Sequence, residues 1–197
     1  MKTKKILLGF AFVLGTLVFN TNVNAQKSMD LDLDKSKVEW FGKKVTGEHS
    51  GSVMLKSGSL EMYGARIVGG EFVMDMTTIK NKDIESDKYR NDLEKHLRSD
   101  DFFGVAKFPE SKFVIKESKN LENGMILVKG EINIKGITKP LEFKVSSHKH
   151  SDSFHVSGTI VIDRTQFDIK YGSGSFFDNL GDRTINNDFE LKFDLMF

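Results

Sequence analysis

Residues 188–197, at the carboxyl end of the chain, alternate between apolar and polar side chains. The apolar positions are Phe189, Leu191, Phe193, Leu195 and Phe197. Side chains two residues apart lie on the same face of a strand, so this pattern predicts a β-strand with one buried face. The same alternation recurs over residues 126–135 and 141–146. One face in water on every strand is typical of antiparallel sheets, because strands of parallel sheets are apolar on both faces.

Further strands are expected in five other segments that show the same alternation. They are residues 37–45, 51–56, 67–77, 112–117 and 154–163. About eight short antiparallel strands form either a sandwich or a closed barrel. Closure leaves no unpaired edge, and an eight-stranded barrel is wide enough for packed side chains or for one slender ligand. The alternation itself does not distinguish a solid core from an apolar cavity.

One segment, residues 86–99, breaks the two-residue period. Tyr89, Leu93 and Leu97 recur every four residues, which predicts an amphipathic helix of about three turns. The expected fold is therefore all-β with one inserted helix.

Two acidic residues and two phenylalanines follow this helix. In one interpretation the helix and this connection form a lid over a barrel mouth, where Phe102 or Phe103 contacts a ligand. In the other, the two phenylalanines plug the end of the core, while Asp100 and Asp101 face water.

The first 25 residues have the organisation of a secretory signal peptide. Three lysines precede an apolar run at residues 6–19, and Val23 and Ala25 occupy the positions that a signal peptidase recognises. We expect cleavage after Ala25, a single domain at residues 26–197, and a periplasmic or secreted protein. The apolar run is shorter than the roughly 20 residues of a membrane span, and no later segment is long enough, so no transmembrane span is expected.

Charge and composition exclude several function classes. Removing these 25 residues, which include three lysines and no acidic residue, changes the formal net charge from +1 to −2. Such a chain lacks the basic surface of a nucleic-acid-binding protein. The absence of cysteine excludes disulfides and thiolate chemistry. No P-loop, dinucleotide fingerprint, nucleophile elbow or zincin helix is present, so we expect neither enzymatic activity nor a cofactor.

The candidate ligand-contacting residues are the apolar side chains expected to point into the barrel and three aromatic residues near its ends. They are Trp40, Phe72, Met74, Met76, Phe102, Phe103, Phe113, Ile115, Phe143, Phe154, Val156, Ile160 and Ile162. Flexible thioethers suit a variable lipid tail, although methionine also fills ordinary cores.

Arg164 continues the inward register of Ile160 and Ile162. In this position its guanidinium could bind an anionic head group, such as a phosphate, in a bidentate manner. Alternatively a bulge turns it outward, or it pairs with Asp163 or Asp168 and holds the end of the barrel together.

Three histidines, His148, His150 and His155, lie close together in the sequence. Histidines at alternate positions of a strand share one face, as in many metal sites. These fall across a polar turn with Asp152 as the nearest acid, so we expect solvent-exposed histidines and no metal site.

Five segments, in order along the chain, resemble the motifs of the YceI-like proteins. They are WFGKKVTGEHSG at residues 40–51, GGEFVMDMTTI at 69–79, HLRSDDFFGVAKFP at 96–109, GEINIKGITKPL at 130–141 and IDRTQF at 162–167. This resemblance implies an extended, lipocalin-like, eight-stranded antiparallel β-barrel, whose apolar tunnel holds a polyisoprenoid or another long-chain amphiphile. It also implies export to the periplasm and the possibility of a homodimer.

We therefore expect an exported lipid-binding protein. Two other functions stay open at this point. One is an enzyme that acts on a small amphiphile in the same pocket, and the other is a ligand-free envelope stress or interaction protein with a solid core.

Overall fold

The computed structural model describes residues 26–150 and 153–197. The expected signal peptide at residues 1–25 lies outside the described residues.

The described part of the chain forms nine β-strands, one α-helix and two short 3-10 helices. The strands are β1 (Gln26–Asp30), β2 (Lys37–Lys44), β3 (Gly47–Tyr63), β4 (Arg66–Asn81), β5 (Glu110–Asn120), β6 (Ile126–Ile134), β7 (Ile137–His150), β8 (Ser153–Asp163) and β9 (Ile185–Met196). The helices are α1 (Asp87–Arg98), η1 (Arg164–Phe167) and η2 (Gly181–Arg183). Alternation predicts β6 and β9 closely, and the helix falls within residues 86–99 as predicted.

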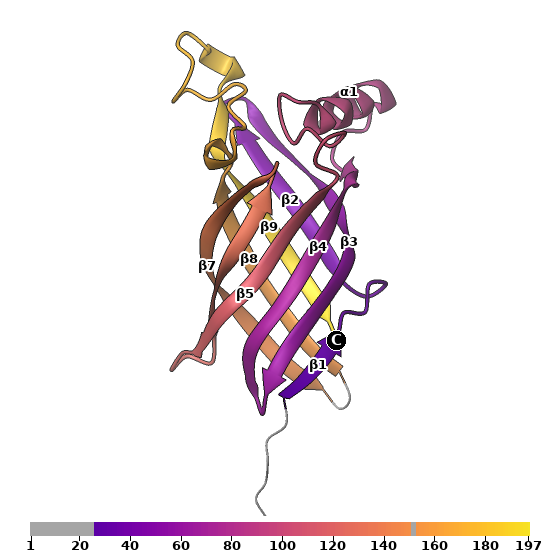
Figure 1. Ribbon diagram of the computed structural model, residues 1–197. Helices are drawn as coiled ribbons and strands as arrows, with labels where there is room; N and C mark the ends of the chain where they lie inside the picture. Colours follow the sequence, from indigo (N-terminus) through magenta and orange to yellow (C-terminus); the bar gives the residue numbers. More distant parts are fainter. Residues whose placement is uncertain (1–25, 151–152) are drawn as a thin grey trace, which may run out of the picture.

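The strands close into a barrel (Figure 1). Each strand from β2 to β9 pairs in antiparallel fashion with its neighbours in the order β3-β2-β9-β8-β7-β6-β5-β4, and the pairing of β3 with β4 completes the ring. The prediction of an eight-stranded antiparallel barrel with one helix is thus confirmed. The additional strand, β1, pairs with the second half of β3.

The longest strands, β3 and β4, have 17 and 16 residues and are irregularly paired. Their register shifts between Ser52 and Met54, between Leu55 and Ser57, and between Glu61 and Met62. Such bulges bend and twist a strand, which helps a sheet to close. They also interrupt the alternation, so the expected segments 51–56 and 67–77 are shorter than the strands that form.

Two glycine positions show how the barrel is shaped. Gly136 has a φ of 77° and follows Lys135 with a φ of 51°, so these two residues form the tight turn between β6 and β7. At Gly130 in β6 a Cβ atom would lie 2.6 Å from Cζ of Phe113 and 2.3 Å from the carbonyl oxygen of Val114. The absence of a side chain at Gly130 therefore lets the Phe113 ring pack across the backbone of β6.

Helix α1 and the segment that contains η1 and η2 lie at the same end of the barrel, away from β1 and the carboxyl terminus (Figure 1). We call it the lid end. Lys135 ties the β6–β7 turn to this end, because its Nζ donates to the carbonyl oxygens of Asp100 at 2.8 Å and Asp168 at 3.3 Å. Among the residues that the structure describes, no helix is long and apolar enough to cross a membrane.

Candidate functional site: two apolar chambers inside the barrel

The interior of the barrel contains two apolar cavities with volumes of about 110 and 70 Å³. We call them the upper chamber, next to the lid end, and the lower chamber. The upper chamber is lined by residues of α1, the connection after it and η1, together with barrel strands. The lower chamber is lined by residues of the strands, among them Leu60 of β3, and by Phe197, which follows β9. The barrel interior is therefore neither a solid core nor one wide tunnel.

Three side chains, Met74, Ile132 and Leu191, line both chambers. They come from β4, β6 and β9, and all three are buried. We call them the neck. Because the same residues form the floor of one chamber and the roof of the other, the two chambers are neighbours and only side chains separate them. Methionine is unbranched and flexible, so Met74 is the neck residue that moves most easily.

Most of the predicted lining residues line a chamber. Trp40, Met76, Phe102, Phe103 and Arg164 line the upper chamber, Phe72, Phe113, Ile115, Phe143, Val156 and Ile160 line the lower one, and Met74 lines both. Contact of any of these residues with a ligand stays a prediction. Two predicted residues are not part of either wall. Ile162 is buried in the core, and Phe154 packs against Phe197 with ring centroids 6.4 Å apart.

Arg164 is buried, with only 4% of its surface exposed, and lies at the wall of the upper chamber. Its Nε donates to the carbonyl oxygen of Asn186 at 2.9 Å, and its terminal nitrogens donate to those of Ile169 at 2.7 Å and Ile185 at 3.1 Å. The arginine thus joins η1 and the residues after it to the start of β9. Burial lowers the pKa of Arg164, and the nearby charge of Asp163 opposes that shift.

Both alternatives for Arg164 are wrong, because its side chain is buried rather than turned outward and it pairs with neither Asp163 nor Asp168. Asp163 instead accepts hydrogen bonds from the backbone N–H and hydroxyl of Thr165, at 2.9 and 2.6 Å. Asp168 pairs with Lys170 at 2.7 Å. Within residues 26–150 and 153–197, Arg164 forms no ion pair with a carboxylate, so backbone carbonyls rather than acids hold it at the barrel end.

Phe102 closes the barrel at the lid end and also forms part of the chamber wall. Its ring lies 5.9 Å from the guanidinium carbon of Arg164, and its centroid lies 4.9 Å from that of His96 and 5.7 Å from that of Tyr171. Phe103 is half-buried and packs against Phe189. The lid and plug interpretations are therefore compatible, because the same rings cover the core and face the upper chamber.

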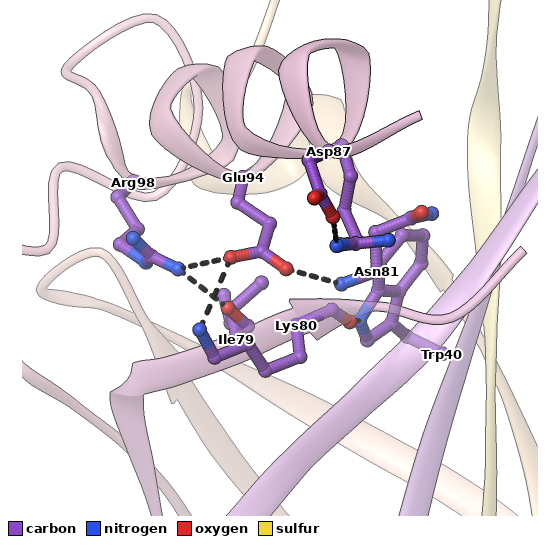
Figure 2. A network of polar contacts seen from close by, with 8 residues as sticks. Trp40, Ile79, Lys80, Asn81, Asp87, Glu94 and Arg98 are labelled. Carbon is purple, nitrogen blue, oxygen red and sulfur yellow. Dashed lines mark hydrogen bonds and ion pairs between the residues drawn. The ribbon is translucent and has the colours of Figure 1, made fainter. Parts of the chain in front are cut away.

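The side chain that anchors α1 was not predicted. Glu94 is buried and points from the middle of the helix toward the end of β4 (Figure 2). Its carboxylate accepts a hydrogen bond from the backbone N–H of Asn81 at 3.0 Å. It also pairs with Arg98 at 2.9 Å and with Lys80 at 3.4 Å. The predicted apolar stripe is only partly correct, because Leu97 packs on the core but Tyr89 is exposed.

The electrostatics of this anchor favour the charged form of Glu94. Burial acts to raise its pKa, but the Asn81 N–H and the charges of Lys80 and Arg98 outweigh burial, and the pKa is lowered. Arg98 also donates to the carbonyl oxygen of Ile79 at 2.8 Å (Figure 2). The helix is thus attached to the last residues of β4 by charge-assisted hydrogen bonds, and α1 covers the lid end without a large apolar interface.

In the part of the chain that the structure describes, no group of three or more histidine, aspartate or glutamate side chains could hold a metal ion. His148 and His155 face each other across β7 and β8, and His155 pairs with Asp194. His49 lies in a separate polar cluster, 2.8 Å from Asp83.

A closed antiparallel barrel with apolar chambers and a helix over one end belongs to the class of barrels that can enclose a small hydrophobic ligand. The family model of the YceI-like domain matches residues 29–197, and the chain belongs to this family.

The curated relatives match over shorter stretches. A UPF0312 protein of Shewanella denitrificans is 34% identical over 82 residues, which are 38% of this chain and 43% of that protein. A UPF0312 protein of Photorhabdus laumondii is 39% identical over 64 residues, or 32% of each chain. The matched part thus spans less than half of the length of these relatives.

Solved structures share the fold at low sequence identity. BcnA of Burkholderia cenocepacia superposes with a TM-score of 0.65 and 20% identity, over 85% of this chain and 99% of that one. A polyisoprenoid binding domain from Saccharophagus degradans, implicated in plant cell wall breakdown, gives a TM-score of 0.62 and 13% identity, over 87% and 98%. The YceI protein of Campylobacter jejuni gives 0.53 and 16%, over 100% and 98%.

Proposed function

We propose that the protein is an exported carrier that binds a polyisoprenoid or a similar long-chain amphiphile, with the apolar tail in the two chambers, and that it performs no chemistry. The observation that carries this proposal is the neck, because three of the described residues, Met74, Ile132 and Leu191, line both chambers and the two spaces therefore adjoin. The family and the polyisoprenoid-binding domain of Saccharophagus degradans support the ligand class. The composition of residues 1–25 supports export to the periplasm or beyond.

The driving force is desolvation of the tail. Each buried methylene contributes about 0.8 kcal/mol, so one five-carbon isoprene unit contributes about 4 kcal/mol before ordering costs. The chambers as they stand, of about 110 and 70 Å³, hold a short tail. A longer tail requires the Met74 side chain to turn away from the neck, so that the two chambers become one continuous space.

The head group belongs at the lid end in this proposal. Arg164 has five N–H donors, and its three hydrogen bonds to carbonyl oxygens leave two of them for another acceptor. No carboxylate in the described part of the chain pairs with its charge. A phosphate there would meet a guanidinium in a water-poor site, where such contacts are strong.

The test uses the single tryptophan of the chain, Trp40, which lines the upper chamber. Addition of farnesol should shift the Trp40 emission in a saturable manner. Ile132→Phe narrows the neck and should weaken binding at least about tenfold, since part of the tail loses its site. Val161→Phe, on an exposed position of β8, is the matched control and should bind like the wild type. No saturable shift with the wild type, or equal affinities in both variants, would contradict the proposal.

A further inference from the structure

The segment between η1 and η2 carries two adjacent phenylalanines into solvent. Phe176 and Phe177 are 49% and 51% exposed, although large apolar side chains usually bury most of their surface. We call these two residues the aromatic tip. In Figure 1 this segment rises from the lid end of the barrel, the end that also carries α1.

Hydrogen bonds within the loop and to β9 fix the conformation in which the aromatic tip is exposed. Ser173, at its base, is fully buried, and its hydroxyl donates to the amide oxygen of Asn187 at 2.7 Å. The amide nitrogen of Asn187 donates to the Ser175 hydroxyl at 2.9 Å. The backbone N–H groups of Phe176 and Phe177 both donate to the carbonyl oxygen of Ser173, at 3.1 and 3.0 Å. These contacts hold the loop in one shape, in which both rings are about half exposed.

Residues at the two ends of this loop line the upper chamber. Ile169 and Ile185, on either side of the loop, line that chamber, as does Arg164. Ile185 is held to the loop by a hydrogen bond from its N–H to the carbonyl oxygen of Gly172 at 2.8 Å. The aromatic tip is thus continuous with the structure that surrounds the proposed head-group position.

Exposed side chains near the tip have the character of a membrane-contacting surface. Tyr171 and Val45 are exposed at this end, and the N–H of Val45 donates to Thr184 at 3.1 Å. Lys170 lies with its Nζ 5.2 Å from the centre of the Phe176 ring. Segments that lie at a membrane surface bury apolar side chains such as phenylalanine at the boundary between head groups and lipid tails, where tyrosine is also enriched, and a neighbouring lysine can reach phosphate groups there. Lys170 also pairs with the exposed Asp168 at 2.7 Å. This acid and the exposed Asp178 and Asp182 limit the electrostatic attraction, so the apolar contact dominates.

We propose that the aromatic tip docks the protein on a phospholipid bilayer. Phe176 and Phe177 insert at the interface, Lys170 reaches the phosphates, and the lid end comes to rest against the lipid surface. This inference rests on the proposed function, because a carrier of a membrane lipid must collect it from a bilayer or deliver it there. A second copy of the chain is the other occupant that two exposed rings could accept, and the test separates the two.

The experiment is co-sedimentation of the protein with vesicles of phosphatidylethanolamine and phosphatidylglycerol that contain no isoprenoid. The wild type should sediment with the vesicles, and the double variant Phe176→Ser/Phe177→Ser should partition at least about tenfold less, since two large apolar side chains lose their contact. The double variant Met54→Ser/Val161→Ser removes two apolar residues of the barrel wall that are at least as exposed as the tip phenylalanines, and it should bind like the wild type.

Equal sedimentation of the wild type and the tip variant would overturn the inference. So would a wild type that forms dimers in analytical ultracentrifugation, does not bind vesicles, and becomes monomeric in the tip variant. The farnesol titration of Trp40, done without vesicles, should be unchanged in the tip variant. If the wild type binds farnesol but not vesicles, only the docking inference fails. If the wild type binds vesicles but not farnesol, the proposed function fails.

Discussion

The carboxylate of Glu94 lies 3.0 Å from the backbone nitrogen of Asn81, and this contact attaches the middle of α1 to the last residue of β4. Asn81 extends the network, because its side chain donates to the carbonyl oxygen of Ser50 at 3.0 Å and to Asp83 at 2.6 Å. The helix over the upper chamber is therefore held through a few polar contacts at one corner of the barrel.

Replacement of Glu94 should detach the helix without unfolding the barrel. Glu94→Ala removes the acceptor of the Asn81 N–H and of Arg98, at a cost of about 1–3 kcal/mol in the free energy that keeps α1 docked on the barrel. We expect faster hydrogen exchange in α1 and little change in the strands. Asp92→Asn, on an exposed position of the same helix, is the control and should exchange like the wild type. Uniform loss of protection across the strands would show that α1 is part of the barrel's cooperative unit.

Acid should weaken the same attachment. The folded-state pKa of Glu94 is lowered below its ordinary value of 4.5, despite burial, by the Asn81 N–H, Lys80 and Arg98. A lowered folded pKa contributes stability that is complete above the unfolded value and is lost as the pH falls through the folded value. The pKa of Asp83 is lowered as well, because hydrogen bonds from Ser50, His49 and Asn81 outweigh its burial.

We therefore expect constant protection of α1 near neutral pH and a progressive loss below about pH 4.5. Hydrogen exchange along the helix, measured as a function of pH and corrected for intrinsic rates, checks this. Glu94→Gln should flatten the pH dependence. An unchanged profile in that variant would contradict the role given to the carboxylate.

Arg164 should matter for stability even without a ligand. Arg164→Met leaves the carbonyl oxygens of Ile169, Ile185 and Asn186 without a donor, which we expect to cost at least about 2 kcal/mol, measured by urea unfolding. The control is Arg183→Met, since that side chain is exposed. Equal stability of the two variants would contradict the structural role.

The head-group role of Arg164 needs a separate readout, because the Met variant is expected to be less stable. The wild type should bind farnesyl phosphate more tightly than farnesol, by at least about tenfold for a charge-assisted contact in a dry site. Arg164→Lys keeps the charge and should keep part of this preference. Equal wild-type affinities for the two ligands would remove the head-group role and leave Arg164 as a residue that holds the barrel end.

A methyl group at Gly130 should disturb the lower chamber. In Gly130→Ala the added Cβ meets the carbonyl oxygen of Val114 at 2.3 Å and the Phe113 ring at 2.6 Å, so the strand and the ring must both shift. Overpacking of this kind costs about 1–3 kcal/mol in the free energy of unfolding. The comparison variant is Gly124→Ser, at a turn where nothing lies within 4 Å of the added Cβ. It carries the backbone strain of a φ of 77° but no steric clash. A Gly130 variant as stable as the wild type would show that the Phe113 ring repacks freely.

Alternation along β6 and β9 follows directly from one buried face, so the sequence predicts antiparallel strands, and the resemblance to the YceI-like motifs favours a barrel over a sandwich. The sequence does not predict β1, which is five residues long and shows no alternation. Nor does it predict the register shifts between β3 and β4. A bulge places two successive residues of one strand opposite one residue of its partner, and this breaks the alternation.

The sequence predicts which side chains point into the barrel, but it does not predict whether they enclose a cavity. Trp40, Met74 and Phe113 have the same hydrophobic character in a solid core and in a chamber wall, and only their packing decides which one forms. Glu94 was missed because apolar periodicity directs attention to Tyr89 and Leu93. The anchor is instead a charge that meets the backbone at the end of a strand, which no periodicity describes.

The most direct test of the central claim is native mass spectrometry of the mature protein, purified without detergent, followed by solvent extraction and identification of the lipid. We expect a mass increase that corresponds to one long-chain isoprenoid per chain and its recovery in the extract. A protein mass without ligand, which stays so after incubation with membrane lipid extract, would contradict the carrier function.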